Sequence, residues 1–145
     1  MIAARILLPL YLAVVGWVTL APVPWRTRTN ETGWGVLGIR TWLDPATWQN
    51  GSAWEFGANV VMFVPLGILL RMAWPRVQGA LVIVGAVAIA GAIEVLQLPL
   101  DRVSDPRDLV ANTIGALAGI AVGTLLLLPR RVRAQRQERE RVSAR

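Results

Sequence analysis

Polar side chains interrupt two segments of this chain that are otherwise apolar enough to lie in a membrane. Glu94 and Gln97 lie near the end of one apolar segment, and Asp108 and Asn112 lie near the start of the next. An unpaired charge at the centre of a bilayer costs ~2.5–3.5 kcal/mol or more, so it persists where it is paired or used. A hairpin between the segments would bring these residues to one membrane face. The sequence therefore predicts a polar site there.

Carboxylates and amides at such a site are suited to binding or to catalysis. Glu94 and Asp108 could act as an acid–base pair, or could hold a hard cation such as Mg²⁺ or Ca²⁺ through oxygen ligands. Alternatively, the site could bind an amphipathic molecule, with Arg102 and Arg107 facing an anionic headgroup. The chain has no Cys and no His, which excludes disulfides, imidazole bases and the usual zinc ligands. No cofactor or catalytic residue can be assigned.

The elements that position these residues are apolar stretches of membrane-spanning length. The chain has 145 residues, is 54% hydrophobic and has a mean hydropathy of +0.50. Each stretch, with its flanking residues, can supply the ~20 helical residues that cross ~30 Å of hydrocarbon. The stretches are 6–21, 56–70, 79–98 and 109–128. We expect an all-α membrane protein, a bundle of four transmembrane helices with a long Trp-containing outer loop.

The first stretch has a second interpretation. Its single arginine, apolar centre and small final residues also describe a secretory signal peptide. Pro22 directly follows the candidate cleavage point and argues against processing. We therefore expect the first stretch to remain as a membrane helix.

Two helix starts carry capping signals. Ser52 precedes Glu55 by three residues, which is the spacing of a capping box. Asp105 is followed by Pro106, which suits an N-cap before a first helical proline. Asparagine comes four residues after the acid in each helix, so the two asparagines should lie at similar depth. The predicted polar cluster comprises Asn59, Glu94, Gln97, Arg102, Asp105, Asp108 and Asn112.

Small residues predict close helix packing. Gly115, Gly119 and Gly123 recur every four residues, a pattern that lets membrane helices approach backbone to backbone. Pro65 interrupts the second stretch and Gly67 follows it, so a kink is expected there. These residues are assigned to helix packing. The glycine ridge would also suit a scaffold that partners other membrane proteins.

The connection after the first stretch is long and rich in tryptophan. Trp25, Trp34, Trp42 and Trp48 lie in it, and they are expected at the headgroup level of the membrane. Asp44-Pro45 predicts the start of a short surface helix.

All fifteen basic residues are arginine, and their distribution predicts the orientation. With four spans both termini share one side, and ten arginines lie on that side, seven of them after residue 129. The positive-inside rule places that side in the cytoplasm. We expect a membrane domain over residues 1–128 and a basic cytoplasmic tail over 129–145. Anionic lipid headgroups, rather than nucleic acid, are the expected neighbours of the tail.

The order of the polar and small residues resembles the VanZ-like family of small bacterial membrane proteins. The resemblance covers about residues 54–123 and rests on Asn59, Phe63-x-Pro65-x-Gly67, Glu94-x-x-Gln97, Arg102-x-x-Asp105-x-x-Asp108-x-x-x-Asn112, Gly115 and Gly119. It implies a multi-pass protein of the bacterial inner membrane. The family's namesake is associated with low-level resistance to teicoplanin, so the resemblance suggests a role in tolerance to envelope antibiotics. It supplies no catalytic residue.

Three functions follow as hypotheses. The first is recognition of an amphipathic or lipid-linked ligand, such as a lipid-linked cell-wall precursor or a lipopeptide, at the outward-facing polar site. The second is a membrane-embedded enzyme that uses Glu94 and Asp108, and the third is a scaffold. Membrane lipids are expected partners, and a homo-oligomer is conceivable.

Overall fold

Long helices form most of the protein. The computed structural model describes residues 2–21, 34–100 and 102–143, with side chains up to Pro129. Its long helices are α1 (Ile2–Leu20), α4 (Ala53–Ala73), α5 (Gly79–Gln97) and α6 (Pro106–Ser143), and the described residues form no strand. Each long helix has a window apolar enough to cross a membrane, with mean hydropathies between 1.7 and 2.3. The predicted fold of four apolar helices is confirmed.

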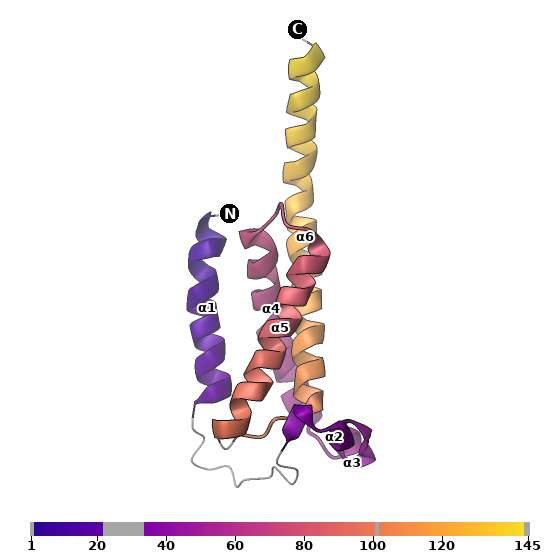
Figure 1. Ribbon diagram of the computed structural model, residues 1–145. Coiled ribbons are helices and arrows are strands. Elements are labelled where there is room, and N and C mark those ends of the chain that lie inside the picture. Colours follow the sequence, from indigo (N-terminus) through magenta and orange to yellow (C-terminus); the bar gives the residue numbers. More distant parts are fainter. Residues whose placement is uncertain (1, 22–33, 101, 144–145) are drawn as a thin grey trace.

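The four helices alternate in direction, as Figure 1 shows. α1 and α5 run toward one end of the bundle, and α4 and α6 run back from it. We call that end, which carries η2 (Leu98–Leu100) and the starts of α4 and α6, the loop end. The opposite end, where α1 begins and α4 connects to α5, is the terminal end. There α6 extends past the other helices as one continuous helix to Ser143, so Pro129, where the tail was expected to begin, lies inside a helix.

The starts of α4 and α6 carry the predicted caps. The Ser52 hydroxyl accepts a hydrogen bond from the Glu55 backbone N–H at 3.4 Å. The Asp105 carboxylate accepts one from the Arg107 backbone N–H at 2.8 Å, and Pro106 is the first helical residue. Side chains at these positions satisfy N–H groups that have no partner within the helix. Both helices therefore begin at the loop end with a side-chain N-cap.

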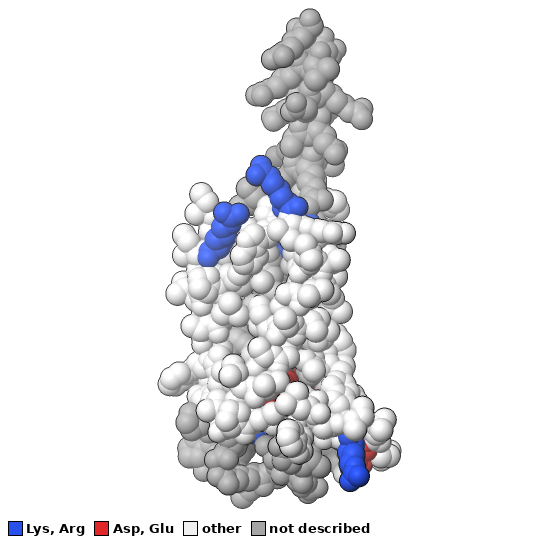
Figure 2. Space-filling model, viewed as in Figure 1, with Lys and Arg blue, Asp and Glu red and all other residues white. Residues whose placement is uncertain are grey.

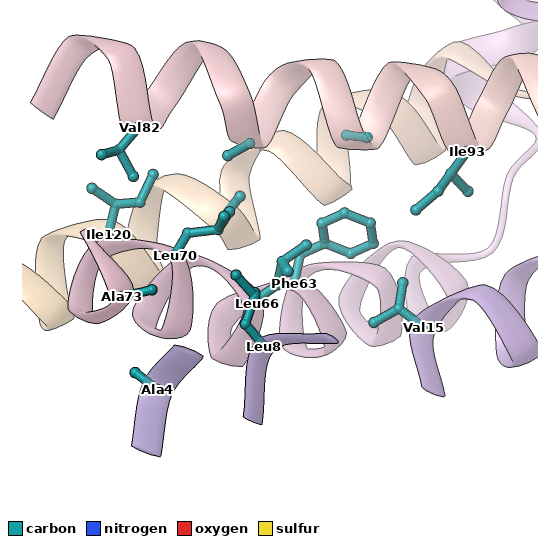
Figure 3. Close-up of a cluster of buried hydrophobic side chains, with 13 residues drawn as sticks. Ala4, Leu8, Val15, Phe63, Leu66, Leu70, Ala73, Val82, Ile93 and Ile120 are labelled. Atoms are coloured by element: carbon teal, nitrogen blue, oxygen red, sulfur yellow. The ribbon is translucent and has the colours of Figure 1, made fainter. Parts of the chain in front are cut away.

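The core lies between the four helices (Figure 3). Phe63 and Leu66 of α4 are fully buried at its centre. α1 contributes Ala4, Leu8 and Val15, α5 contributes Val82, Ala86, Ala90 and Ile93, and α6 contributes Ala116 and Ile120. Many other large apolar side chains point outward, as Trp17 of α1 and Leu81 of α5 do. A bundle that is apolar on both its inner and outer faces is suited to a lipid surrounding.

α4 and α6 run in the same direction and make the closest helix contact. A Cβ atom on Gly115 would overlap the carbonyl oxygen of Val60, and one on Gly119 would overlap that of Val64. From the other helix, a Cβ on Gly67 would overlap the carbonyl oxygen of Ala116. Gly123 packs against the side chain of Arg71 and the Ile68 carbonyl. The glycine ridge is therefore used within the chain, which removes it as the partner surface of a scaffold. α4 stays one helix through Pro65.

Arginines join the helices at the terminal end. Arg71 is only 4% exposed, and its guanidinium donates to the carbonyl oxygens of Trp74 and Val77 and to the hydroxyl of Thr124. Arg5 of α1 donates to the carbonyl oxygen of Ala73, the last residue of α4. The end of α4 thus carries cations that bind its last carbonyl groups, as its helix dipole favours. Arg71 turns inward instead of reaching for the membrane surface.

Short helices form the described part of the connection between α1 and α4. They are η1 (Gly35–Leu37), α2 (Ile39–Leu43) and α3 (Pro45–Gln49), at the loop end. Asp44 caps α3 by accepting from the Ala46 N–H, and Pro45 follows it as predicted. Trp42 and Trp48 pack with ring centroids 6.2 Å apart. Trp34 is 70% exposed. Trp25 lies outside the described residues.

The charged side chains that the structure describes lie toward the two ends of the bundle. On the face in Figure 2 the basic atoms gather at the terminal end and beside the short helices, and the surface between them is almost entirely uncharged. Arg5 and Arg76 belong to the terminal end, and Arg40 to α2. An uncharged belt between charged ends is the surface expected of a chain that spans a bilayer.

Candidate functional site

A polar pocket of about 300 Å³ lies at the loop end, inside the bundle. All four long helices contribute to its walls. Val18, Ala58 and Met62 supply apolar surface. The polar lining residues are Thr19, Glu55, Asn59, Glu94, Gln97, Arg102, Asp108 and Asn112. The structure therefore brings six of the seven residues of the predicted cluster to one pocket, and places Asp105 just behind it.

Glu94 lies one turn before the end of α5 and is 1% exposed. Its Oε2 accepts a hydrogen bond from the Asp105 backbone N–H at 3.1 Å, and the Ser104 side chain hydrogen-bonds to the same carboxyl group. These bonds tie the end of α5 to the turn that starts α6. The burial of this carboxyl is offset by hydrogen bonds, as physical chemistry requires.

Gln97 lies on the same face of α5, one turn further on, and is 5% exposed. Its Nε2 donates to the carbonyl oxygen of Thr19 near the end of α1, at 3.1 Å. Because a carbonyl can only accept, this bond fixes which end of the amide is nitrogen. The amide oxygen, Oε1, is buried and has no hydrogen-bond partner.

The wall formed by α4 and α6 combines two carboxyl groups, those of Glu55 and Asp108, with two amides. The Asn59 side chain of α4 hydrogen-bonds to Asp108 of α6, which places these two residues at a similar depth in the bundle. Asn112, one turn after Asp108, is 2% exposed, and its Oδ1 is buried without a partner. Asp108 and Glu94 lie near enough to interact electrostatically.

Arg102 and Arg107 both make contacts within the protein. Arg102 lines the pocket, but its guanidinium donates to the carbonyl oxygens of Ala21 and Val18, at 3.0 and 3.4 Å, and so caps the end of α1. The Arg107 guanidinium lies 5.9 Å from the centre of the Phe56 ring and packs against Gly51. Arg102 thus holds α1, and Arg107 lies outside the pocket lining.

Ser104 is a member of this site that the sequence did not indicate. It is 3% exposed, hydrogen-bonds to Glu94, and accepts from the Val36 backbone N–H at 3.2 Å. Gly35, which has a positive φ of 43°, packs against it so closely that a Cβ would lie 2.5 Å from the serine Cβ. Ser104 therefore connects the short helices of the loop end to the pocket. A lone serine in a short connection carries no signal of such a role.

α1 is hydrogen-bonded to both α4 and α5. The Tyr11 hydroxyl of α1 donates to the Met62 carbonyl oxygen of α4, whereas Thr19 further along α1 accepts from Gln97 of α5. The exposed lining residues are Val18 of α1 and Glu55 and Ala58 of α4. We call Val18 and Ala58 the apolar margin of the pocket.

Four long apolar helices around a buried polar pocket define the class as a multi-pass α-helical membrane protein. Within that class, the family model described as VanZ/LLP1 matches residues 8–127, and the chain belongs to this family. No curated protein and no solved structure matches the chain.

Proposed function

We propose that this VanZ-like protein recognises an amphipathic or lipid-linked ligand of the cell envelope in the polar pocket. Through that recognition it would contribute to tolerance of glycopeptides or other envelope antibiotics. The observation that carries the proposal is the pocket itself: about 300 Å³ of polar space within membrane-spanning helices, with two buried amide oxygens left without a partner. Buried polar groups normally have partners, and an unpartnered one calls for an explanation.

The position of the pocket suits a ligand that is half polar and half apolar. Its walls carry carboxyl and amide groups, while its margin is formed by Val18 and Ala58. Beyond the margin, Val14 and Val61 expose apolar surface. A polar headgroup would fill the pocket and an acyl chain would lie along α1 and α4.

The arginine distribution supports an outward-facing site. The terminal end carries Arg5, Arg71 and Arg76, and α6 continues there into the arginine-rich segment 129–143. If this end is cytoplasmic in a bacterial inner membrane, the loop end and its pocket face outward. Lipid-linked cell-wall precursors and lipopeptides would meet the pocket from that side.

The test compares pocket variants with a matched variant at the terminal end. Gln97→Met and Asn112→Leu remove the unpartnered oxygens at near-constant volume, and Gln78→Met changes an exposed glutamine away from the pocket. Each is expressed in a sensitive bacterial host, and growth inhibition by teicoplanin and by a cyclic lipopeptide is measured. We expect the wild type and Gln78→Met to raise the inhibitory concentration at least about twofold, and both pocket variants to lose that gain.

Protein amount in the membrane is measured alongside by immunoblot. Pocket variants that are present at wild-type level and still protect as well as the wild type would overturn the proposal.

The carboxyl pair favours a second candidate, a membrane-embedded enzyme. Glu94 and Asp108 line the same pocket and interact electrostatically, which suits an acid and a base acting on one substrate. Turnover of an envelope lipid by the purified wild type, lost in Glu94→Gln, would favour this candidate over simple recognition.

A further inference from the structure

Two buried polar atoms of the pocket residues lack a hydrogen-bond partner, and both are acceptors. Gln97 lines the pocket and uses its N–H₂ group on Thr19, so the unpartnered atom of its side chain is a carbonyl oxygen. Asn112, which also lines the pocket, has a second unpartnered amide oxygen. An amide oxygen cannot donate a hydrogen bond at any pH. A ligand that satisfies both groups must therefore bring donors.

The charges of the lining residues also favour a ligand that brings donors and a positive charge. Glu55, Glu94 and Asp108 are acidic, and Arg102 is the basic residue among the lining. Arg102 directs N–H groups to the end of α1. An anionic group such as a phosphate would meet three acidic side chains and two unpartnered amide oxygens, against a single arginine whose guanidinium already donates to the end of α1.

A directly bound metal ion fits less well than an organic cation. Among the residues that the structure describes, no three acidic side chains gather closely enough to form a metal site. The pocket volume of about 300 Å³ lies at the lower end of the range of small-molecule sites, which is room for a small headgroup. A primary ammonium carries three N–H donors, no acceptor and a positive charge.

We propose that the pocket takes a primary ammonium group, whose N–H donors bind the amide oxygens of Gln97 and Asn112 beside the carboxyl groups of Glu94 and Asp108. This inference rests on the proposed function, because it names the chemistry of the ligand in the same pocket. The ammonium group can belong to a lipid headgroup or to a small free amine. The exposed apolar margin at Val18 and Ala58 gives a lipid tail a place to lie.

Native mass spectrometry of the purified protein tests the donor requirement. Phosphatidylethanolamine, its N,N-dimethyl derivative and phosphatidylcholine with the same acyl chains form a series that loses N–H donors while keeping the cation. We expect phosphatidylethanolamine to be retained about tenfold more than phosphatidylcholine, with the dimethyl lipid between them. Gln97→Met and Asn112→Leu should remove this preference, and Gln78→Met should keep it. Equal retention across the series would overturn the inference.

Free ethanolamine distinguishes the two sources of the group. If millimolar ethanolamine displaces the lipid, the ammonium alone is sufficient for binding; if it does not, the acyl chain is part of the ligand. Either result agrees with an ammonium site, provided the lipid series shows its preference.

Phosphatidylglycerol separates failure of this inference from failure of the proposed function. Preferred retention of phosphatidylglycerol that the pocket variants abolish would leave a ligand pocket but overturn the ammonium assignment. Retention that is the same for every lipid and unaffected by the pocket variants would count against both.

Discussion

At the residue scale, the carboxyl group of Glu94 joins the end of α5 to the turn that starts α6. It is a carboxyl group inside a membrane helix, and it is held by the backbone N–H of Asp105 and by Ser104. The hydrogen bond to the backbone needs an acceptor oxygen but no charge. Folding and ligand binding should therefore respond differently to loss of the oxygen and to loss of the charge.

We expect Glu94→Gln to fold like the wild type, because its amide oxygen can still accept from the Asp105 N–H. It should nevertheless lose the envelope phenotype or the ligand. Glu94→Leu should melt at a lower temperature in detergent, since leaving a buried N–H without a partner costs about 1–3 kcal/mol. Thermal melts of the three proteins measure this difference. A Gln variant that keeps both stability and function would show that the carboxylate is dispensable at the site.

At the element scale, the contact between α4 and α6 fixes the depth of the pocket walls. Gly115 and Gly119 bring the two parallel helices together, and the same contact sets Asn59 beside Asp108. Packing of this kind has no tolerance for a methyl group at the point of closest approach, because the backbone of the neighbouring helix would have to move.

Gly119→Ala should therefore destabilise the protein by about 1–3 kcal/mol, the usual cost of overpacking. Its Cβ would overlap the Val64 carbonyl oxygen and lie 2.9 Å from the Ile68 nitrogen. Gly91→Ala is the matched control, since nothing lies within 4 Å of a Cβ at that helical position. The control should be neutral or slightly stabilising, because alanine favours helix over glycine by up to ~1 kcal/mol. Equal melting temperatures of the two variants would contradict this contact.

At the scale of the whole molecule, the decisive property is which end faces the cytoplasm. Both connections at the loop end are tied to the pocket, the first through Val36 and Ser104 and the second through Asp105 and Glu94. The orientation therefore decides from which side a ligand can enter.

Single cysteines can establish this orientation, because the chain contains none of its own. Asn50, at the loop end, and Gln78, at the terminal end, are both exposed. We expect Asn50→Cys to react with a membrane-impermeant maleimide in intact cells, and Gln78→Cys to react after the cells are opened. The reverse pattern would place the pocket on the cytoplasmic side.

The amino-acid sequence by itself determined the four spans and the caps of α4 and α6. Those features depend on the transfer of local segments into lipid and on hydrogen bonds between residues two or three positions apart. It also identified Glu94, Gln97, Asp108 and Asn112 as side chains that must find partners, because lipid offers none.

Only the tertiary structure decided which partners these groups have. The bonds from Gln97 to Thr19, from Arg102 to Ala21 and from Val36 to Ser104 join residues 78, 81 and 68 positions apart. Such pairs depend on how each helix is rotated and tilted against its neighbours, which the spacing within one helix does not fix. For that reason neither the bonds by which Arg102 holds the end of α1 nor the role of Ser104 could be read from the chain. The acceptor character of the pocket follows from the same contacts, because it is the bond to Thr19 that leaves the oxygen of Gln97 unpaired.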